Sequence, residues 1–216
     1  MKRFELITEA DARMLPIGST VELAEGGHVT PLARDTLRER RVTVVTLGGY
    51  DAELPPDLAP VSPVRRVAIG SDHTGVALKA ALVGHLRAQG LAVDDLGVDA
   101  ADTPADYPDT AAAVARAVAR GEADAGIALD GAGIGSAIAA NKVVGIRAAT
   151  ATDERVARYA REHNGANVLA LGATLLAGAD EAFRIVDTWL RTPMREPRYL
   201  RRLLKIRRLE EEERRS

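Results

Sequence analysis

The side chains best suited to chemistry in this sequence lie around one glycine-rich turn, Leu129-Asp130-Gly131-Ala132-Gly133-Ile134-Gly135-Ser136. A β-type apolar run leads into the turn, and a helical run of small residues leaves it. Glycines at this spacing allow a tight turn and a close approach to a ligand, and the free N–H groups of the next helix favour an anion such as phosphate. Gly131, Gly133 and Gly135 are therefore candidate binding residues beside Asp130, although a strand-to-helix connection without a ligand is the alternative.

Further polar residues stand next to other predicted strands. Asp72 and His73 follow an apolar run at 67–70, where the aspartate could instead cap the next helix. His163 and Asn164 end a predicted helix, a position at which the helix dipole also favours a positive imidazolium. The set is completed by Tyr107 in a helix-entry turn and by Arg198 and Arg202 on a charged helix that could equally form a solvated face.

Together these residues suit a phosphorylated small metabolite. Fixed dipoles and arginines bind a phosphate group, and a carboxylate with a histidine can move protons between carbon and oxygen. We expect the residues to meet at one edge of an α/β sheet, because such folds bind ligands at the carboxyl ends of their strands.

The composition narrows the classes of protein and of functional site that the sequence allows. The 216 residues carry a formal net charge of −2 and are 46% hydrophobic, as in a globular protein with a substantial core. That charge gives no reason to expect nucleic acid or an anionic membrane as a partner. Cysteine is absent, which excludes disulfides, thiolate metal sites and a cysteine nucleophile. The sequence shows neither a signal peptide nor a membrane-spanning run, so we expect a cytoplasmic protein.

From Arg66 onward, strand and helix patterns alternate. The predicted strands are 67–70, 91–96, 126–129, 146–150 and 167–171, and the predicted helices are 76–89, 107–120, 134–141, 154–163 and 179–190. Five short apolar strands separated by helices predict a parallel sheet covered on both faces, which is a Rossmann-like three-layer α/β/α sandwich. A charged helix follows at 198–215.

The first part of the chain reads as a separate unit. Residues 1–50 predict a small α+β extension with helices at 9–15 and 32–40 and strands at 21–23 and 42–45. Residues 51–65 contain four prolines among small and acidic residues, which is typical of a linker. Residues 66–216 then form the main domain.

Residues 66–207 resemble the ribose-5-phosphate isomerase B and galactose-6-phosphate isomerase family. The resemblance rests on Ile69-Gly70-Ser71-Asp72-His73, Asp106-Tyr107-Pro108, Gly133-Ile134-Gly135 with Ala139-Ala140-Asn141-Lys142, Gly145-Ile146-Arg147-Ala148, and His163-Asn164 with Ala166-Asn167-Val168-Leu169. It implies aldose–ketose isomerisation of a phosphorylated sugar through an enediol(ate), without a metal or cofactor. It also implies a homodimer or homotetramer with active sites between subunits.

The resemblance also implies residue roles. His163 would assist ring opening, Asp72 and Asn164 would hold sugar hydroxyls, and Tyr107 would line the site. His73, Arg198 and Arg202 would be candidates for binding the phosphate.

Several positions depart from the family pattern. Asp130 replaces the usual cysteine base, and Ser136 stands where some members have a glutamate. Three further differences are Ala132 for a threonine or serine, Thr174 for an arginine and Tyr199 for a histidine. An aspartate followed by a serine at the first two positions is similar to the A-type subunit of galactose-6-phosphate isomerase.

Two hypotheses follow from these departures. In the first, Asp130 is the base. The reference pKa of an aspartate carboxyl, about 3.9, is too low for ideal proton abstraction at neutral pH unless burial raises it. In the second, Asp130 caps the helix, and the chain has a structural or regulatory role beside a paralogous partner subunit. A nucleotide-binding module fits less well, because a dinucleotide site wants Gly-x-Gly-x-x-Gly directly after a strand.

The extension has a weaker resemblance of its own. Ile7-Thr8-Glu9-Ala10 and Thr30-Pro31-Leu32-Ala33-Arg34-Asp35 resemble the N-terminal segment of the ethanolamine-utilisation cobalamin adenosyltransferase. That resemblance implies an assembly or targeting module for a bacterial microcompartment. The alternative is a stabilising extension that packs on the dimer.

Overall fold

The computed structural model describes residues 2–46, 58–194 and 196–214, which divide into two units, 1–56 and 57–216. No helix in these described ranges is long and apolar enough to cross a membrane.

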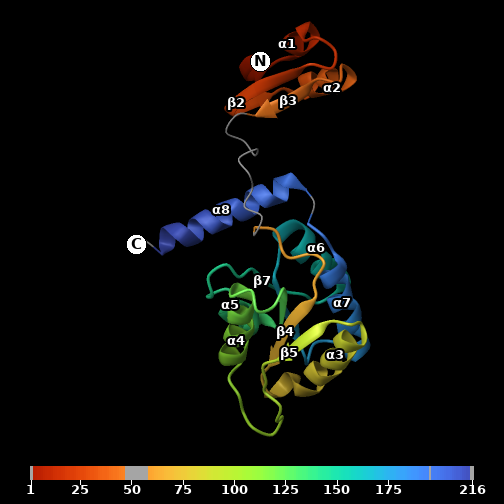
Figure 1. The fold of residues 1–216 in the computed structure, drawn as a ribbon, viewed down its shortest axis with the longest axis vertical. Helices are drawn as coiled ribbons and strands as arrows, with labels where there is room; N and C mark the ends of the chain where they lie inside the picture. The colour runs from red at the N-terminus through yellow and green to blue at the C-terminus, as the bar shows by residue number, and fades with distance from the viewer. Residues whose placement is uncertain (1, 47–57, 195, 215–216) are drawn as a thin grey trace. The chain divides into compact units, whose positions relative to one another are not determined.

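The first unit contains three strands and two helices (Figure 1): β1 (Arg3–Ile7), α1 (Glu9–Met14), β2 (Thr20–Val29), α2 (Pro31–Glu39) and β3 (Thr43–Thr46). The side chains of Thr8 and Thr30 cap the two helices by accepting hydrogen bonds from backbone N–H groups. All described strands of this unit are parallel, in the order β1-β2-β3. The arrangement is therefore a βαβαβ unit instead of the expected α+β extension, because residues 3–7 form a strand that their irregular pattern did not predict.

The second unit contains the larger sheet (Figure 1). Its elements are β4 (Arg66–Ser71), the 3₁₀ turn η1 (His73–Gly75), α3 (Val76–Ala88), β5 (Ala92–Asp95), α4 (Tyr107–Ala119), β6 (Ala125–Asp130), α5 (Ile134–Ala140), β7 (Ala148–Thr150), α6 (Glu154–Asn164), β8 (Val168–Gly172), α7 (Ala179–Arg191) and α8 (Pro197–Glu213). The five strands are parallel, in the order β5-β4-β6-β8-β7. The predicted three-layer α/β/α sandwich is confirmed.

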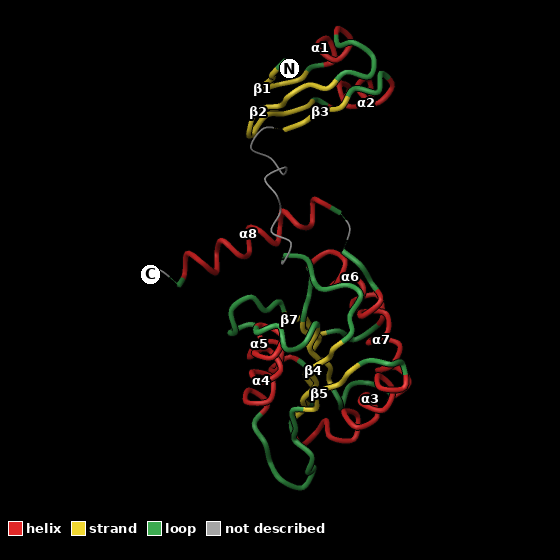
Figure 2. Tube along the Cα trace, in the orientation of Figure 1, coloured by secondary structure: helices red, strands yellow, loops and turns green. Residues whose placement is uncertain are grey.

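Helices cover both faces of this sheet (Figure 2). Side chains of α3, α6 and α7 form the larger core on one face, and α4 and α5 pack on the other. Every residue of the central strands β6 and β8 is buried, which explains their continuous apolar runs. Gly126 lets α4 approach closely, since a Cβ there would lie 2.7 Å from the Val114 side chain.

The segments that precede and follow the sandwich in the sequence are also packed against it. Residues 47–57 of the predicted linker lie outside the described part of the chain, whereas Leu58 and Val64 are buried in the second unit. Leu203 of α8 is 1% exposed, and the Glu210 carboxylate accepts a hydrogen bond from the Gly145 N–H at 2.9 Å. The charged tail helix is thus fixed to the body of the unit.

Candidate active site

The central strands β4 and β6 bring two of the polar loops together. These strands are neighbours at the point where the strand order reverses, which is where open α/β sheets bind ligands. The Asp72 N–H donates to the Leu129 carbonyl at 3.1 Å, so Asp72 begins its loop beside Asp130. Both aspartates are buried, with exposed fractions of 6% and 5%.

The Asp130 carboxylate occupies the glycine turn itself. Its Oδ1 atom accepts hydrogen bonds from the N–H groups of Ala132 at 2.7 Å and Gly133 at 2.5 Å. Its Oδ2 atom accepts one from the N–H of Ser136 at 2.7 Å. The backbone donors that the sequence offers to a ligand anion are therefore bound by an anion of the chain.

These bonds also set the charge of Asp130. Burial would raise the pKa of its carboxyl, but hydrogen bonds from Ser136 and from the N–H groups of Gly133 and Ala132 outweigh it and lower the pKa below the usual value. The carboxylate is therefore ionised at neutral pH, and burial does not produce the more basic Asp130 that the first hypothesis favoured.

We expect Asp130→Asn to destabilise the protein by about 1–3 kcal/mol at pH 7, because one carboxylate oxygen is replaced by an amide that cannot accept. A pKa lowered by folding gives stability that is present above the unfolded-state pKa and lost as the pH falls through the folded-state value. The difference in free energy of unfolding between the two proteins should therefore shrink below about pH 4. Urea unfolding of both proteins between pH 7 and values below about pH 4 measures this difference in free energy. A difference that stays constant with pH would contradict the lowered pKa of Asp130.

Asp72, His73 and Tyr107 lie around the same edge of the sheet. Asp72 Oδ1 accepts hydrogen bonds from the N–H of Thr74 at 2.9 Å and from its hydroxyl at 2.6 Å, so Asp72 does cap the turn η1. His73 Nδ1 lies 3.2 Å from the Ala105 N and 3.3 Å from the Ala105 carbonyl oxygen, so the backbone of Ala105 holds this side of the imidazole ring.

The Tyr107 ring packs directly against the glycine turn. A Cβ at Gly135 would come within 2.6 Å of the ring atoms Cε2 and Cζ of Tyr107. Glycine at this position therefore lets the aromatic ring lie over the start of α5. The sequence did not predict this requirement, which supplies a second reason for the third glycine of the turn.

His163 and Asn164 lie at the opposite edge of the sheet, so the expectation of one common edge is wrong. Strands β6 and β8 pair from Gly126 with Val168 to Asp130 with Gly172. His163 and Asn164 end α6 just before Val168, whereas Asp130 ends β6, and four residue steps along a strand span about 13 Å. The physical reason is topological: a helix that returns to the start of a parallel strand ends at the amino edge.

An aromatic cluster surrounds His163 at this amino edge. Its ring stacks on Tyr159 with a centroid distance of 4.7 Å and on Tyr199 of α8 with a distance of 4.4 Å. The Arg202 guanidinium lies 5.6 Å from the centre of the Tyr199 ring. The side chain of Arg198 lies outside the described residues.

The cluster continues to Asn164, whose Nδ2 donates to the Tyr159 carbonyl at 3.1 Å. Tyr199 is one of the departures from the family pattern, and its contact with His163 follows from no local signal in the sequence. No group of three His, Asp or Glu side chains in the described parts of the chain could hold a metal ion.

Known proteins resemble the second unit. The family model described as Ribose/Galactose Isomerase matches residues 67–206. Ribose-5-phosphate isomerase B of Escherichia coli is 44% identical over 127 residues, which span 59% of this chain and 84% of that protein. D-erythrulose-4-phosphate isomerase of Pectobacterium atrosepticum is 42% identical over 124 residues, which span 57% of this chain and 81% of that protein.

Solved structures also resemble the second unit. Ribose-5-phosphate isomerase B of Clostridium thermocellum superposes with a TM-score of 0.66 and 46% identity, covering 68% of this chain and 98% of that chain. The enzyme of the same name from Mycoplasma genitalium, solved with bound ribulose 5-phosphate, superposes with a TM-score of 0.65 and 40% identity. The match covers 68% of this chain and 97% of that chain.

Proposed function

The chain belongs to the ribose/galactose isomerase family, and from that membership we propose that it is an enzyme that interconverts ribose 5-phosphate and ribulose 5-phosphate. Relatives named ribose-5-phosphate isomerase B support this substrate, as does the related structure with bound ribulose 5-phosphate. The observation within the chain that carries the proposal is the pair of buried carboxylates, Asp72 and Asp130, beside the glycine turn at the end of β4 and β6.

In the proposed mechanism a base takes the proton from C2 of the open-chain aldose and returns it to C1 through an enediol(ate). We assign the base to Asp130 Oδ2, because Oδ1 already accepts two backbone N–H groups whereas Oδ2 accepts one. Negative charge that develops on the enediolate oxygens would lie near the N-terminus of α5, whose dipole favours it.

The other roles follow from position and chemistry. His73 Nε2 and the Arg202 guanidinium are donors suited to the phosphate, with Arg198 as a further candidate. Asp72 and Asn164 would hold sugar hydroxyls, and Tyr107 would line the site. His163 would move the proton that opens the furanose ring.

These roles require two copies of the chain. Asp130 and His163 lie at opposite edges of one sheet, about 13 Å apart along β6, which is too far for both to act on one pentose phosphate. We therefore propose a homodimer, or a tetramer built from dimers, in which His163 reaches the Asp130 of its partner. Exposed Ile134 and Ile138 on α5, next to the glycine turn, supply an apolar surface for such an interface.

Mixing two variants that are each impaired in the conversion of ribose 5-phosphate, assayed in that direction, tests this arrangement. Asp130→Asn and His163→Gln subunits that exchange at random give half mixed dimers, each with one intact site of two, so about a quarter of the wild-type activity should return. Each variant carried through the same exchange by itself is the control. Mixed dimers, verified by a mass tag, that remain inactive would contradict a site shared between subunits.

The hydrogen bonds of Asp130 also favour a second candidate function. A carboxylate held by three backbone N–H groups behaves as a helix cap, as in a family member that works beside a partner subunit carrying the cysteine. Turnover of ribose 5-phosphate by the purified chain supports the first function. A folded protein that converts neither this sugar nor D-erythrulose 4-phosphate would overturn it in favour of the second.

The first unit lies outside the family match and forms its own parallel sheet. We propose that it is an assembly or targeting module, and that the enzyme works in the cytoplasm within a bacterial microcompartment. The separate fold of this unit and the resemblance of its Thr30-Pro31-Leu32 segment support the proposal.

A further inference from the structure

Two arginines, Arg161 in α6 and Arg147 directly before β7, bind the turn that follows His163 and Asn164. Arg161 Nη1 donates to the Ala166 carbonyl at 2.8 Å, and Arg147 Nε donates to the Gly165 carbonyl at 2.9 Å. Gly165 has a φ of 58°, the left-handed conformation that ends α6. Two successive carbonyl groups directly after Asn164 are therefore fixed by charged donors.

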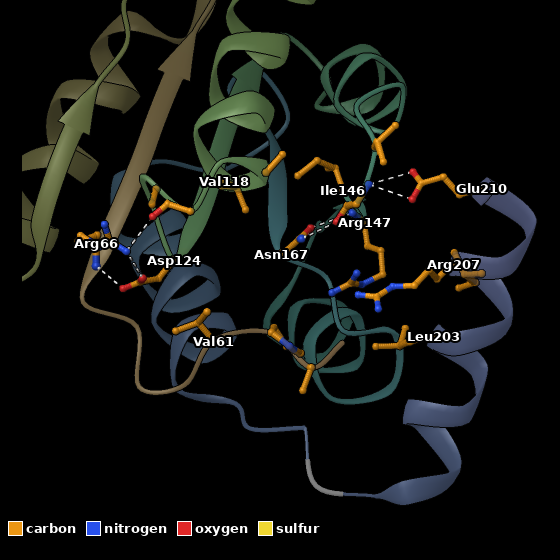
Figure 3. A pocket seen from close by; sticks show the side chains of 18 residues that line it. Val61, Arg66, Val118, Asp124, Ile146, Arg147, Asn167, Leu203, Arg207 and Glu210 are labelled. Carbon is orange, nitrogen blue, oxygen red and sulfur yellow. Dashed lines mark hydrogen bonds and ion pairs between the residues drawn. The ribbon is translucent and has the colours of Figure 1, made fainter. Parts of the chain in front are cut away.

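The same two guanidinium groups bind the segment that precedes the sheet. Arg161 Nη2 donates to the Val61 carbonyl at 2.7 Å, and Arg147 Nη2 donates to the Leu58 carbonyl at 3.3 Å. The Leu58 side chain is 1% exposed, which anchors this segment. Figure 3 shows Val61 and Arg147 lining one groove of about 340 Å³. Residues 58–61 lie outside the family match at 67–206 but belong to the second unit, so this unit begins before the matched residues.

Arg161 cannot easily exchange these partners. Its side chain is 1% exposed and its guanidinium lies 5.0 Å from the centre of the Trp189 ring. Burial, together with the positive charge of Arg147, lowers the pKa of Arg161 to about 10, so the group remains charged at neutral pH. A buried charge needs its hydrogen-bond partners, and the backbone carbonyls of Val61 and Ala166 are the partners present.

Apolar groups also pack against the turn. A Cβ on Gly165 would lie 2.6 Å from Leu203 Cδ1 and 3.4 Å from Met194 Sδ. The same Cβ would lie 3.5 Å from Arg147 Nε, so Arg147 and Leu203 of α8 enclose the turn together.

We infer that Arg147 and Arg161, with the carbonyls of residues 58 and 61, form a clamp that positions His163 and Asn164 for the sugar. Arg147 and Arg161 are positioning residues, since they act through the turn. The inference rests on the proposed function, because it assigns the clamp to the ring-opening half of that site. It also gives residues 58–61 a role in the isomerase unit.

Proton NMR of the histidine rings tests the geometry without any substrate. The chain has four histidines, at positions 28, 73, 85 and 163. In Arg161→Met, which keeps the packing on Trp189 but removes the donors, the His163 ring signals should shift while those of His73 and His85 stay in place. The matched control is Arg158→Met on the exposed face of the same helix, in which all four sets of signals should stay in place.

Kinetics provide the second readout. Arg161→Met should lower kcat for ribose 5-phosphate about tenfold with a smaller change in KM, since acid–base catalysis depends on exact placement of the proton donor. Arg161→Lys, which retains a charged donor, should recover part of the loss. Arg147→Met, at a half-exposed site, should shift the same His163 signals if Arg161→Met does not fold.

The outcomes distinguish failure of the clamp from failure of the proposed isomerase function. A folded Arg161→Met or Arg147→Met protein with unshifted His163 signals overturns the clamp, whatever the activity. If the wild-type protein lacks isomerase activity and the His163 signals still shift in the two variants, the proposed function is overturned. The clamp then remains as a feature of the fold.

Discussion

Asp130→Asn is expected to lower kcat for ribose 5-phosphate isomerisation by about 10²- to 10⁴-fold, the range that a positioned general base supplies. An asparagine keeps the size of the side chain and still caps part of the turn, but it cannot accept the C2 proton. KM should change little, because the phosphate and hydroxyl contacts come from other side chains. A coupled assay of ribulose 5-phosphate formation measures both constants.

Asp130→Cys is the informative control, because it restores the residue that the family usually carries before the glycine turn. A thiol at the N-terminus of α5 has a lowered pKa and forms a reactive thiolate, so this variant should be at least as active as the wild type. If Asp130→Asn retains full turnover, Asp130 is not the base. If the wild type is inactive and Asp130→Cys is active, Asp130 is a helix cap and the chain is the partner-dependent family member.

His163→Gln is expected to impair one direction of the reaction more than the other. Ribose 5-phosphate exists mainly as a furanose that must be opened, whereas ribulose 5-phosphate cannot close a five-membered ring because its O5 carries the phosphate. Loss of the ring-opening acid or base should therefore lower the forward kcat/KM by about 10²-fold. The reverse rate should stay nearly unchanged, since the aldehyde product can close its ring in solution.

Initial rates in both directions measure this asymmetry. His85→Gln is the matched control, because His85 lies between α3 and α7, where its ring stacks on Phe183 at 4.1 Å and its Nε2 lies 2.9 Å from Asp187 Oδ1. Its forward and reverse rates should equal those of the wild type. Equal losses in both directions for His163→Gln would assign His163 to the proton transfer at carbon or to substrate binding instead of ring opening.

The order of strands and helices could be predicted from the sequence because the signals are local. Continuous apolar runs of four to six residues predicted the buried strands, and Asp130 was placed correctly before the helix of small residues. Strand β1 was missed because its pattern is interrupted: the register with β2 shifts between Phe4 and Leu6. A bulge of this kind breaks the alternation by which a strand is recognised.

The arrangement of the site depended on contacts that residue types do not encode. Asp72 and His163 carry similar polar signals, yet one follows a strand and the other precedes one, so the topology separates them by the length of the sheet. Beside the side chain of Ser136, the groups that lower the pKa of Asp130 are backbone N–H groups, which every residue except proline has. The arginine clamp likewise binds carbonyl groups, and no spacing of side chains in the sequence could reveal it.

The anchored segment at Leu58 also bears on how such chains can be recombined in evolution. The family outline begins at residue 67, yet Leu58 and Val61 already belong to the isomerase unit through their contacts with Arg147 and Arg161. A shuffling event that joined a new N-terminal module at the start of β4 would remove one carbonyl partner from the buried Arg161 and one from the half-exposed Arg147. A junction placed upstream of Leu58 would keep both of these contacts.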